Sequence, residues 1–120
     1  IFISGKGPLK ADGNYVLGKL GENLTLDQGY EAARLTAINL ISTLKASIGD
    51  LSKVKRIVRV TGMVNATSNF TDHPKVVNGC SDLLVEVFGD NGKHTRAAVG
   101  MNSLPLNIAV EIDMVVELYN

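Results

Sequence analysis

The residues best suited to chemistry stand near the end of the chain, in the stretch HTRAAVGMNSLPLNIAVEIDMVVEL, residues 94–118. Arg96 precedes a run of small residues, and Glu111 interrupts a run of Val and Ile. A guanidinium can grip a carboxylate through two parallel hydrogen bonds, and small neighbours leave room for a ligand. Glu111 could then hold a water molecule or a proton. The alternative is a cross-strand ion pair of Arg96 with Glu111 or Asp113, which would stabilise the fold only slightly.

Other reactive side chains carry weaker signals. Cys80 falls within an apolar helical stripe, which favours a small buried hydrophobe over a nucleophile. His94 stands beside a predicted turn, where a solvated or hydrogen-bonded role is favoured over acid–base catalysis. His73 is the only other histidine, and no Cys/His cluster has the spacing of a zinc site. We therefore expect no metal site. The sequence also has neither a phosphate-binding glycine loop nor a serine-nucleophile motif.

Composition narrows the class of protein. The 120 residues suggest a single domain, residues 1–120. The chain has twelve Lys and Arg and twelve Asp and Glu, so its formal net charge is zero. It lacks the excess of basic residues that would indicate a nucleic-acid partner. A lone cysteine cannot form an internal disulfide, which fits a cytoplasmic protein, and no apolar run reaches the roughly 18 residues of a membrane span. The chain starts at Ile1 with a strand-like segment, so upstream residues could be missing.

Two helices are predicted from apolar periodicity. In the stretch 24–50, apolar side chains recur at steps of three and four, and Thr25 or Asp27 can cap the start. The stretch 71–90 shows a second apolar stripe. Gly79 lies inside that stripe, where glycine costs about 1 kcal/mol relative to alanine. We therefore expect another part of the chain to approach closely at Gly79.

Five segments have the composition of strands, namely residues 1–4, 14–17, 51–66, 94–101 and 108–118. The last two are expected to form a hairpin, and Gly62 is a candidate bulge. The order β-β-α-β-α-β-β predicts the α+β class, a mixed sheet with both helices on one face. In the last strand apolar residues alternate with Glu111, Asp113, Val115 and Glu117. Such a half-apolar second face is expected to meet another subunit.

Several motifs resemble the YjgF/RidA family. FISGKGP at residues 2–8 resembles its [TS]-S-G-Q-x-P segment, and R-x-x-V-x-x-x-x-LP-x-x-x-x-VEI at residues 96–112 resembles its closing signature. Residues 31–64 are similar to its central helix, G-D-L turn and strand. The sequence around HTRAAVG resembles a less-characterised branch of this family. The resemblance implies a chorismate-mutase-like α+β fold and a homotrimer with clefts between neighbouring subunits.

The resemblance also implies a reaction, the hydrolysis of 2-imino acids or their enamine tautomers to 2-keto acids and ammonia, without metal or cofactor. By position, Arg96 matches the arginine that grips the substrate carboxylate, and Glu111 the glutamate that positions water. Gly5 matches a glycine whose backbone faces the ligand, and Asn78 a helix asparagine near the cleft. Ala98 stands where many members carry a pocket-lining cysteine. A tyrosine that precedes the first strand in typical members has no counterpart here.

Two other functions compete with this one. A trimer of the same kind could bind a small carboxylate metabolite for sensing or regulation, without turnover. Some relatives are named for RNA cleavage. Zero net charge and 5% aromatic residues argue against RNA as a partner, because binding a polyanion needs basic and stacking side chains.

Overall fold

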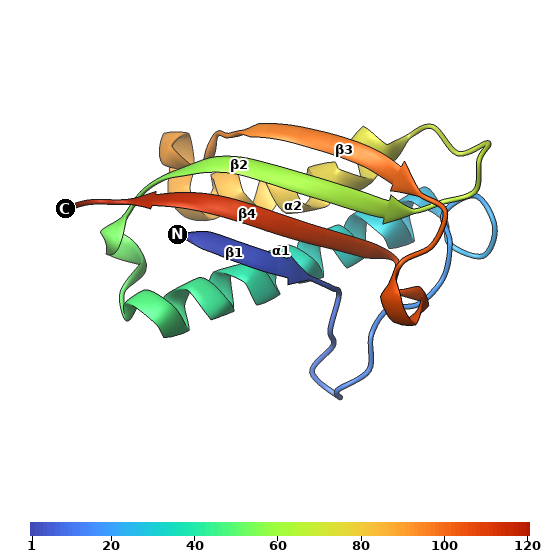
Figure 1. Cartoon of the computed structure of the whole chain (residues 1–120), viewed down its shortest axis with the longest axis horizontal. Helices are drawn as coiled ribbons and strands as arrows, with labels where there is room; N and C mark the ends of the chain where they lie inside the picture. Colours follow the sequence, from blue (N-terminus) through green and yellow to red (C-terminus); the bar gives the residue numbers. More distant parts are fainter.

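The computed structural model describes residues 1–120, which form two helices and four strands with short 3-10 turns between them (Figure 1). In chain order the elements are β1 (Phe2–Lys6), α1 (Leu26–Ile48), β2 (Val54–Asn65), α2 (His73–Phe88), β3 (Thr95–Met101) and β4 (Val110–Leu118). No helix has both the length and the apolar character needed to cross a bilayer.

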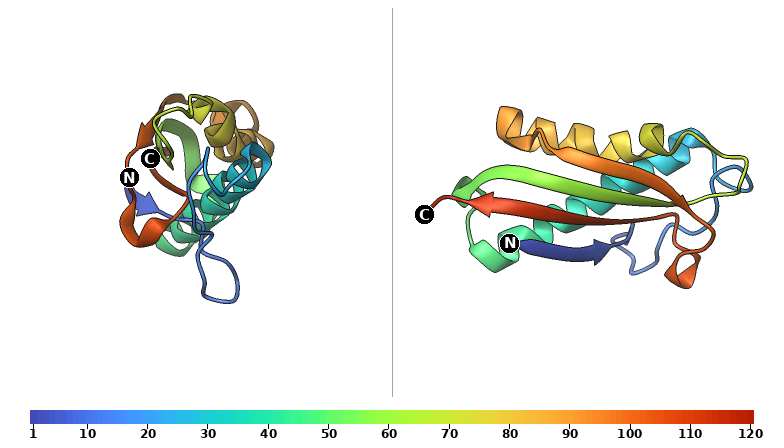
Figure 2. Two further views of the ribbon diagram at one scale, coloured as in Figure 1. Left: turned by 90° about the vertical axis from the view of Figure 1, so that its right-hand side faces the viewer. Right: turned by 45° about the horizontal axis from the view of Figure 1, so that its top comes forward.

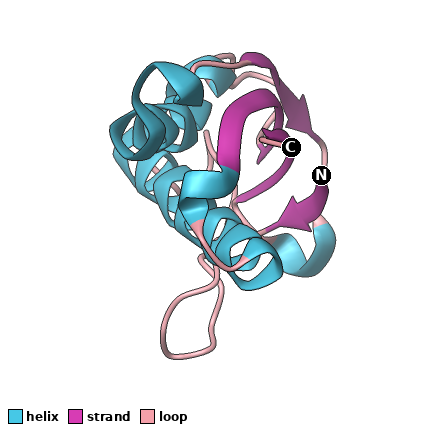
Figure 3. Ribbon diagram, turned by 90° about the vertical axis from the view of Figure 1, so that its left-hand side faces the viewer, coloured by secondary structure: helices cyan, strands magenta, loops and turns pink.

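The four strands form one mixed sheet in the order β1-β4-β2-β3. β4 pairs antiparallel with both β1 and β2, whereas β3 pairs parallel with β2 and forms an edge of the sheet. Both helices cover the same face of this sheet, and the loop between β1 and α1 projects away from it (Figures 2 and 3). The prediction of an α+β fold with helices on one face is therefore confirmed.

The hydrophobic core lies between the helices and the sheet. The alternation predicted for the last strand holds, because its inward residues Val110, Ile112, Met114 and Val116 are buried in the core. They meet the apolar stripes of both helices, which bury residues such as Leu40 and Leu84. Burial of this apolar surface is the main force that holds helices and sheet together.

Local signals explain where α1 begins and ends. Thr25 is the N-cap: its side chain accepts from the Gln28 backbone N–H, and the Gln28 side chain accepts from the Thr25 N–H. This reciprocal pair satisfies two N–H groups that the first turn cannot satisfy itself. Gly49 ends the helix with φ of 86°, a conformation that glycine adopts without steric cost.

The helices cross closely at Gly79, as its position inside α2 predicted. A Cβ placed on Gly79 would collide with the backbone carbonyl oxygen of Tyr30 in α1. Gly62 of β2 has a similar function, since a Cβ there would lie 2.6 Å from Val77 of α2. The prediction of a bulge at Gly62 is wrong: Gly62 pairs in regular register, and the irregularities of β2 lie between Val54 and Arg59.

The predicted strand at residues 14–17 is also wrong. This segment makes only single bridges, Leu9 with Tyr15 and Leu17 with Ile108. Gly13 and Gly18, with φ of 88° and 128°, turn the chain on either side of it. The segment between these turns is too short to run along a neighbour, so four strands form instead of five.

The expected hairpin of the last two strands does not form either. β2 lies between β3 and β4, and pairs with both. The connection between them contains Leu106 and Asn107 with φ of 59° and 61°, a left-handed turn that leads the chain across the end of β2. Residues of β3 and β4 therefore cannot form a cross-strand pair.

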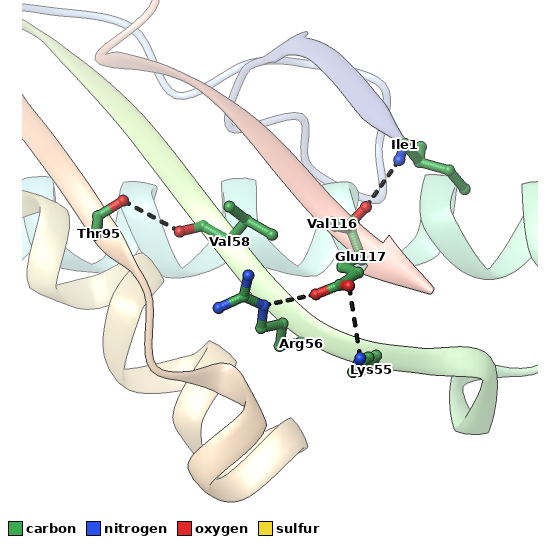
Figure 4. Close-up of polar contacts among 7 residues, drawn as sticks. All are labelled: Ile1, Lys55, Arg56, Val58, Thr95, Val116 and Glu117. Carbon is green, nitrogen blue, oxygen red and sulfur yellow. Dashed lines mark hydrogen bonds and ion pairs between the residues drawn. The ribbon is translucent and has the colours of Figure 1, made fainter. Parts of the chain in front are cut away.

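The face of the sheet away from the helices is uncovered and half apolar. Ala97 and Val99 of β3 lie on it, in register with Thr61 and Met63 of β2. At one end Arg56 donates from Nε to Glu117 at 2.7 Å, and Lys55 lies 3.7 Å from the same carboxylate (Figure 4). The bond from Arg56 holds the pKa of Glu117 below its ordinary value. In the same view the Thr95 hydroxyl donates to the Val58 carbonyl at 3.1 Å.

Candidate functional site

A depression of about 310 Å³ lies between α2 and the edge strand β3. It is lined by Asn78, Ser81 and Val85 of α2 together with Lys93, His94 and Arg96 at the start of β3. Asn78, Ser81 and Val85 are three and four residues apart, so they share one face of the helix. The structure thus brings Asn78 and Arg96 together, as the resemblance implied for two residues far apart in sequence.

Arg96 is half-buried on the helix side of β3. Its Nη1 donates to Ser81 Oγ at 3.0 Å, and its Nη2 donates to the Pro74 carbonyl at 3.2 Å. No carboxylate lies within 4 Å of the guanidinium, so the alternative of an ion pair with Glu111 or Asp113 is wrong. A half-buried arginine without a carboxylate partner is suited to bind an anion from solution.

Ser81 and His94 form a hydrogen-bonded pair behind Arg96. Ser81 Oγ lies 2.8 Å from His94 Nε2, and His94 Nδ1 lies 2.6 Å from the Gly92 carbonyl oxygen. Both ring nitrogens of His94 therefore have a hydrogen-bond partner, so this side chain is not merely solvated. Sequence reasoning missed Ser81, although its spacing of three residues from Asn78 on a helix could have indicated it.

Glu111 lies on the opposite side of the sheet. It is in register with Met63, and its carboxylate packs against Gly5 of β1: a Cβ on Gly5 would lie 2.7 Å from Glu111 Oε2. Glycine at position 5 therefore makes room for this carboxylate. Gly5 and Glu111 form a second group, separated by the sheet from the group around Arg96.

Ala98 belongs to the Arg96 side. It is in register with Gly62, which faces α2, and it packs against the core. Its methyl group offers no nucleophile. Cys80 offers none either, because burial raises the pKa of its thiol to about 12, against the opposing influence of Arg96. A buried thiol of this kind stays protonated at neutral pH.

No three His, Cys, Asp or Glu side chains are grouped so that they could hold a metal ion. A separate cavity lies outside the region around Arg96. The largest cavity, about 570 Å³, lies between α1 and the segment that precedes it. Leu24, Leu35 and Ile38 line it, with Lys10 and Arg34 among its charged residues. This cavity contains none of the residues expected to do chemistry.

Comparison with known proteins gives a consistent result. Residues 1–118 match the family described as "YjgF/chorismate_mutase-like, putative endoribonuclease". Protein TCP17 of Trypanosoma cruzi is 43% identical over 121 residues, which are 100% of this chain and 76% of that protein.

Solved structures are similar throughout. Atu1372 of Agrobacterium tumefaciens, described as of unknown function, is 40% identical, with a TM-score of 0.95 over 98% of this chain and 75% of that chain. A "putative endoribonuclease" of Shewanella oneidensis MR-1 is 37% identical, with a TM-score of 0.93 over 98% of this chain and 78% of that chain. Family match, identity and fold agree, and the chain belongs to the YjgF/chorismate mutase-like family.

Proposed function

We propose that this protein hydrolyses reactive 2-imino or enamino acids to 2-keto acids and ammonia, at clefts between the subunits of a homotrimer. The observation that carries the proposal is the half-buried Arg96, which faces solvent beside Asn78 without a carboxylate partner. Membership of the YjgF family supports the choice of reaction.

The positions of the two residue groups support the proposed assembly. Arg96 and Glu111 lie on opposite sides of one sheet, so a cleft that uses both must combine two chains. The uncovered sheet face offers a surface for this contact, with Val99 and Phe2 exposed on it. Burying such a face against copies of itself is how closed homo-oligomers form.

The chemistry requires little from the protein. Arg96 would hold the substrate carboxylate with the N–H groups that Ser81 and Pro74 leave free. Glu111 of a neighbouring subunit would orient a water molecule toward the imine carbon, which is already electrophilic. Water adds to give a carbinolamine, a proton moves to nitrogen, and ammonia leaves as the ketone forms. Asn78 and Ala98 would shape the pocket around the substrate, and Gly5 gives Glu111 room.

The test is ammonia release from an imine generated in place by an amino-acid oxidase. Semicarbazide in the mixture traps imine that survives, so an active protein lowers semicarbazone formation in proportion to its concentration. Undiminished semicarbazone at all protein concentrations would reject the deaminase, provided that the protein is folded and oligomeric.

A second function, binding of a small carboxylate without turnover, is favoured by one observation. The family resemblance implies that many members carry a pocket-lining cysteine where this chain has Ala98, so the pocket here would differ in shape from theirs. Calorimetry with 2-keto acids distinguishes the two: binding without ammonia release identifies the non-catalytic protein. Incubation with RNA completes the test, and we expect no cleavage because the net charge is zero.

A further inference from the structure

For a neutral His94 ring, the contacts around Ser81 set the direction of each hydrogen bond. The Gly92 carbonyl can only accept, so the neutral His94 ring carries its proton on Nδ1 and donates it to that oxygen at 2.6 Å. Nε2 is then a free acceptor, and it lies 2.8 Å from Ser81 Oγ. The Ser81 hydroxyl therefore donates to His94, and its oxygen accepts from Arg96 at 3.0 Å.

This is the arrangement of a serine prepared for nucleophilic attack. A base lies within hydrogen-bond reach of the hydroxyl, and a third group, the Gly92 carbonyl, holds the base in the required tautomer. The Arg96 guanidinium donates to Ser81 Oγ, so its positive charge stabilises the negative charge that this oxygen gains as its proton passes to His94. Ser81 and His94 are both half-buried and line the same open depression, so a small molecule can reach them.

We propose that Ser81 is a nucleophile activated by His94, and that the depression between α2 and β3 hydrolyses small carboxylic esters through an acyl-serine intermediate. A depression of about 310 Å³ suits a short acyl group. The proposal does not depend on imine hydrolysis or on the trimer, because Ser81, His94 and Arg96 all come from one chain.

Each step balances. Ser81 Oγ attacks the ester carbonyl carbon and its proton passes to His94 Nε2, giving a tetrahedral adduct whose oxyanion faces the Arg96 guanidinium. Collapse of the adduct breaks the bond to the alcohol oxygen, which leaves with the proton from His94. Water then attacks the acyl carbon as His94 accepts its proton. The carboxylic acid leaves when the bond to Ser81 Oγ breaks, and His94 returns the proton to that oxygen. The net reaction is ester plus water to acid plus alcohol, with no other reactant.

His73 offers a matched control. It is the other histidine, and its ring lies edge-on to Phe70 with centroids 5.5 Å apart, without a hydroxyl partner. Ser103 is exposed in the loop after β3 and serves as the control serine. Substitutions at His73 and Ser103 should therefore leave ester hydrolysis unchanged.

The experiment follows p-nitrophenyl acetate hydrolysis and locates the acetyl group by peptide mass spectrometry of the quenched protein. We expect acetyl on Ser81, and a loss on the order of 100-fold in His94→Gln and Ser81→Ala, the scale of general-base catalysis. His73→Gln and Ser103→Ala should match the wild-type protein. Far-ultraviolet circular dichroism verifies that each variant is folded.

Two results would overturn the proposal: an acetyl group found only on lysines, or equal rates for Ser81→Ala and the wild-type protein. A fluorophosphonate probe supplies a measurement that needs no variant, since it should label the wild-type protein at Ser81. Absence of label on Ser81 would mean that the Ser81–His94 pair only orients Arg96.

Discussion

Arg96 and Glu111 lie on opposite faces of the sheet, and β2 separates the strands that carry them. Arg96 turns toward α2, where it bonds Ser81, whereas Glu111 packs beside Gly5 on the face that no helix covers. One chain therefore presents the guanidinium of Arg96 and the carboxylate of Glu111 to two different surroundings. A reaction that uses both must take place where two chains meet.

We expect Arg96→Ala to reduce the proposed imine hydrolysis about 100-fold or more, because the substrate carboxylate would lose its bidentate partner and its position. The activity of Arg96→Lys should fall between those of Arg96→Ala and the wild-type protein, since lysine keeps the positive charge but lacks the planar guanidinium. Ammonia release measures activity, and light scattering after gel filtration verifies that the variant has the same molar mass in solution as the wild-type protein. Undiminished activity in Arg96→Ala would show that Arg96 does not anchor the substrate.

Mixing two inactive variants should restore activity. If each cleft takes Arg96 from one chain and Glu111 from the next, Arg96→Ala and Glu111→Gln subunits can combine into complete clefts. Random assembly of equal amounts gives about a quarter of the clefts both residues, hence about a quarter of wild-type ammonia release. The measurement is activity after joint refolding, with each variant refolded alone as control. No recovery would show that the reaction does not combine Arg96 of one chain with Glu111 of another.

Two valines test which face forms the oligomer. Val99 is 41% exposed on the uncovered sheet face, and Val87 is 45% exposed on α2. We expect Val99→Asp to dissociate the proposed trimer, because a charge in an apolar interface loses its hydration, while Val87→Asp should leave the proposed trimer intact. Sedimentation velocity measures the outcome. Dissociation by Val87→Asp alone would place the interface on the helices.

The two helix starts predict unequal effects of the same change. Thr25→Ala removes a side-chain cap and one side of a reciprocal pair, so the free energy of unfolding should fall by about 1 kcal/mol. Asp72 occupies the N-cap of α2 but makes no side-chain cap bond, so Asp72→Ala should cost less. Urea unfolding measures both. Equal losses would mean that the Thr25 bond contributes nothing particular.

Because α1 and α2 cross closely at Gly79, glycine should be more stabilising than alanine at this position, the reverse of the usual helix preference. Alanine favours a helix over glycine by about 1 kcal/mol, yet Gly79→Ala should destabilise by about 1–3 kcal/mol because its methyl group would meet the Tyr30 carbonyl. Ser47→Ala, at an exposed position of α1, is the control and should be neutral or slightly stabilising. A more stable Gly79→Ala protein would show that the helices can separate without cost.

Local sequence patterns predicted where each helix and strand lies better than they predicted which strands lie side by side. Apolar periodicity located both helices, and strict alternation located β4, because each pattern reflects one face of one element against the core. The close approach at Gly79 was also predictable, since an interior glycine needs a packing reason. Strand order was not predictable. A hairpin connection, which places two consecutive strands side by side, and a connection that crosses β2 have similar amino-acid composition. Here the connection crosses β2, and it contains Leu106 and Asn107 in the left-handed conformation.

The residues of the candidate site were likewise predictable only in part. Arg96 was identifiable from its chemistry, and Asn78, inferred from the resemblance, lies in the same depression. Ser81 was not found, because its contact with Arg96 depends on how α2 docks against β3, which no local pattern records. The roles of Gly5, Asn78, Ala98, Arg96 and Glu111 in turnover stay predictions until the variants are measured.

The cavity beside α1 affects how ligands should be sought. It is larger than the depression around Arg96, more apolar, and formed by a different helix. A compound that fills it would bind only the folded chain and raise the melting temperature, whether or not it reaches Arg96. Thermal shift alone would therefore collect hits of two kinds. Repeating each measurement on Arg96→Ala separates them, because only compounds bound at the β3 edge should lose their effect.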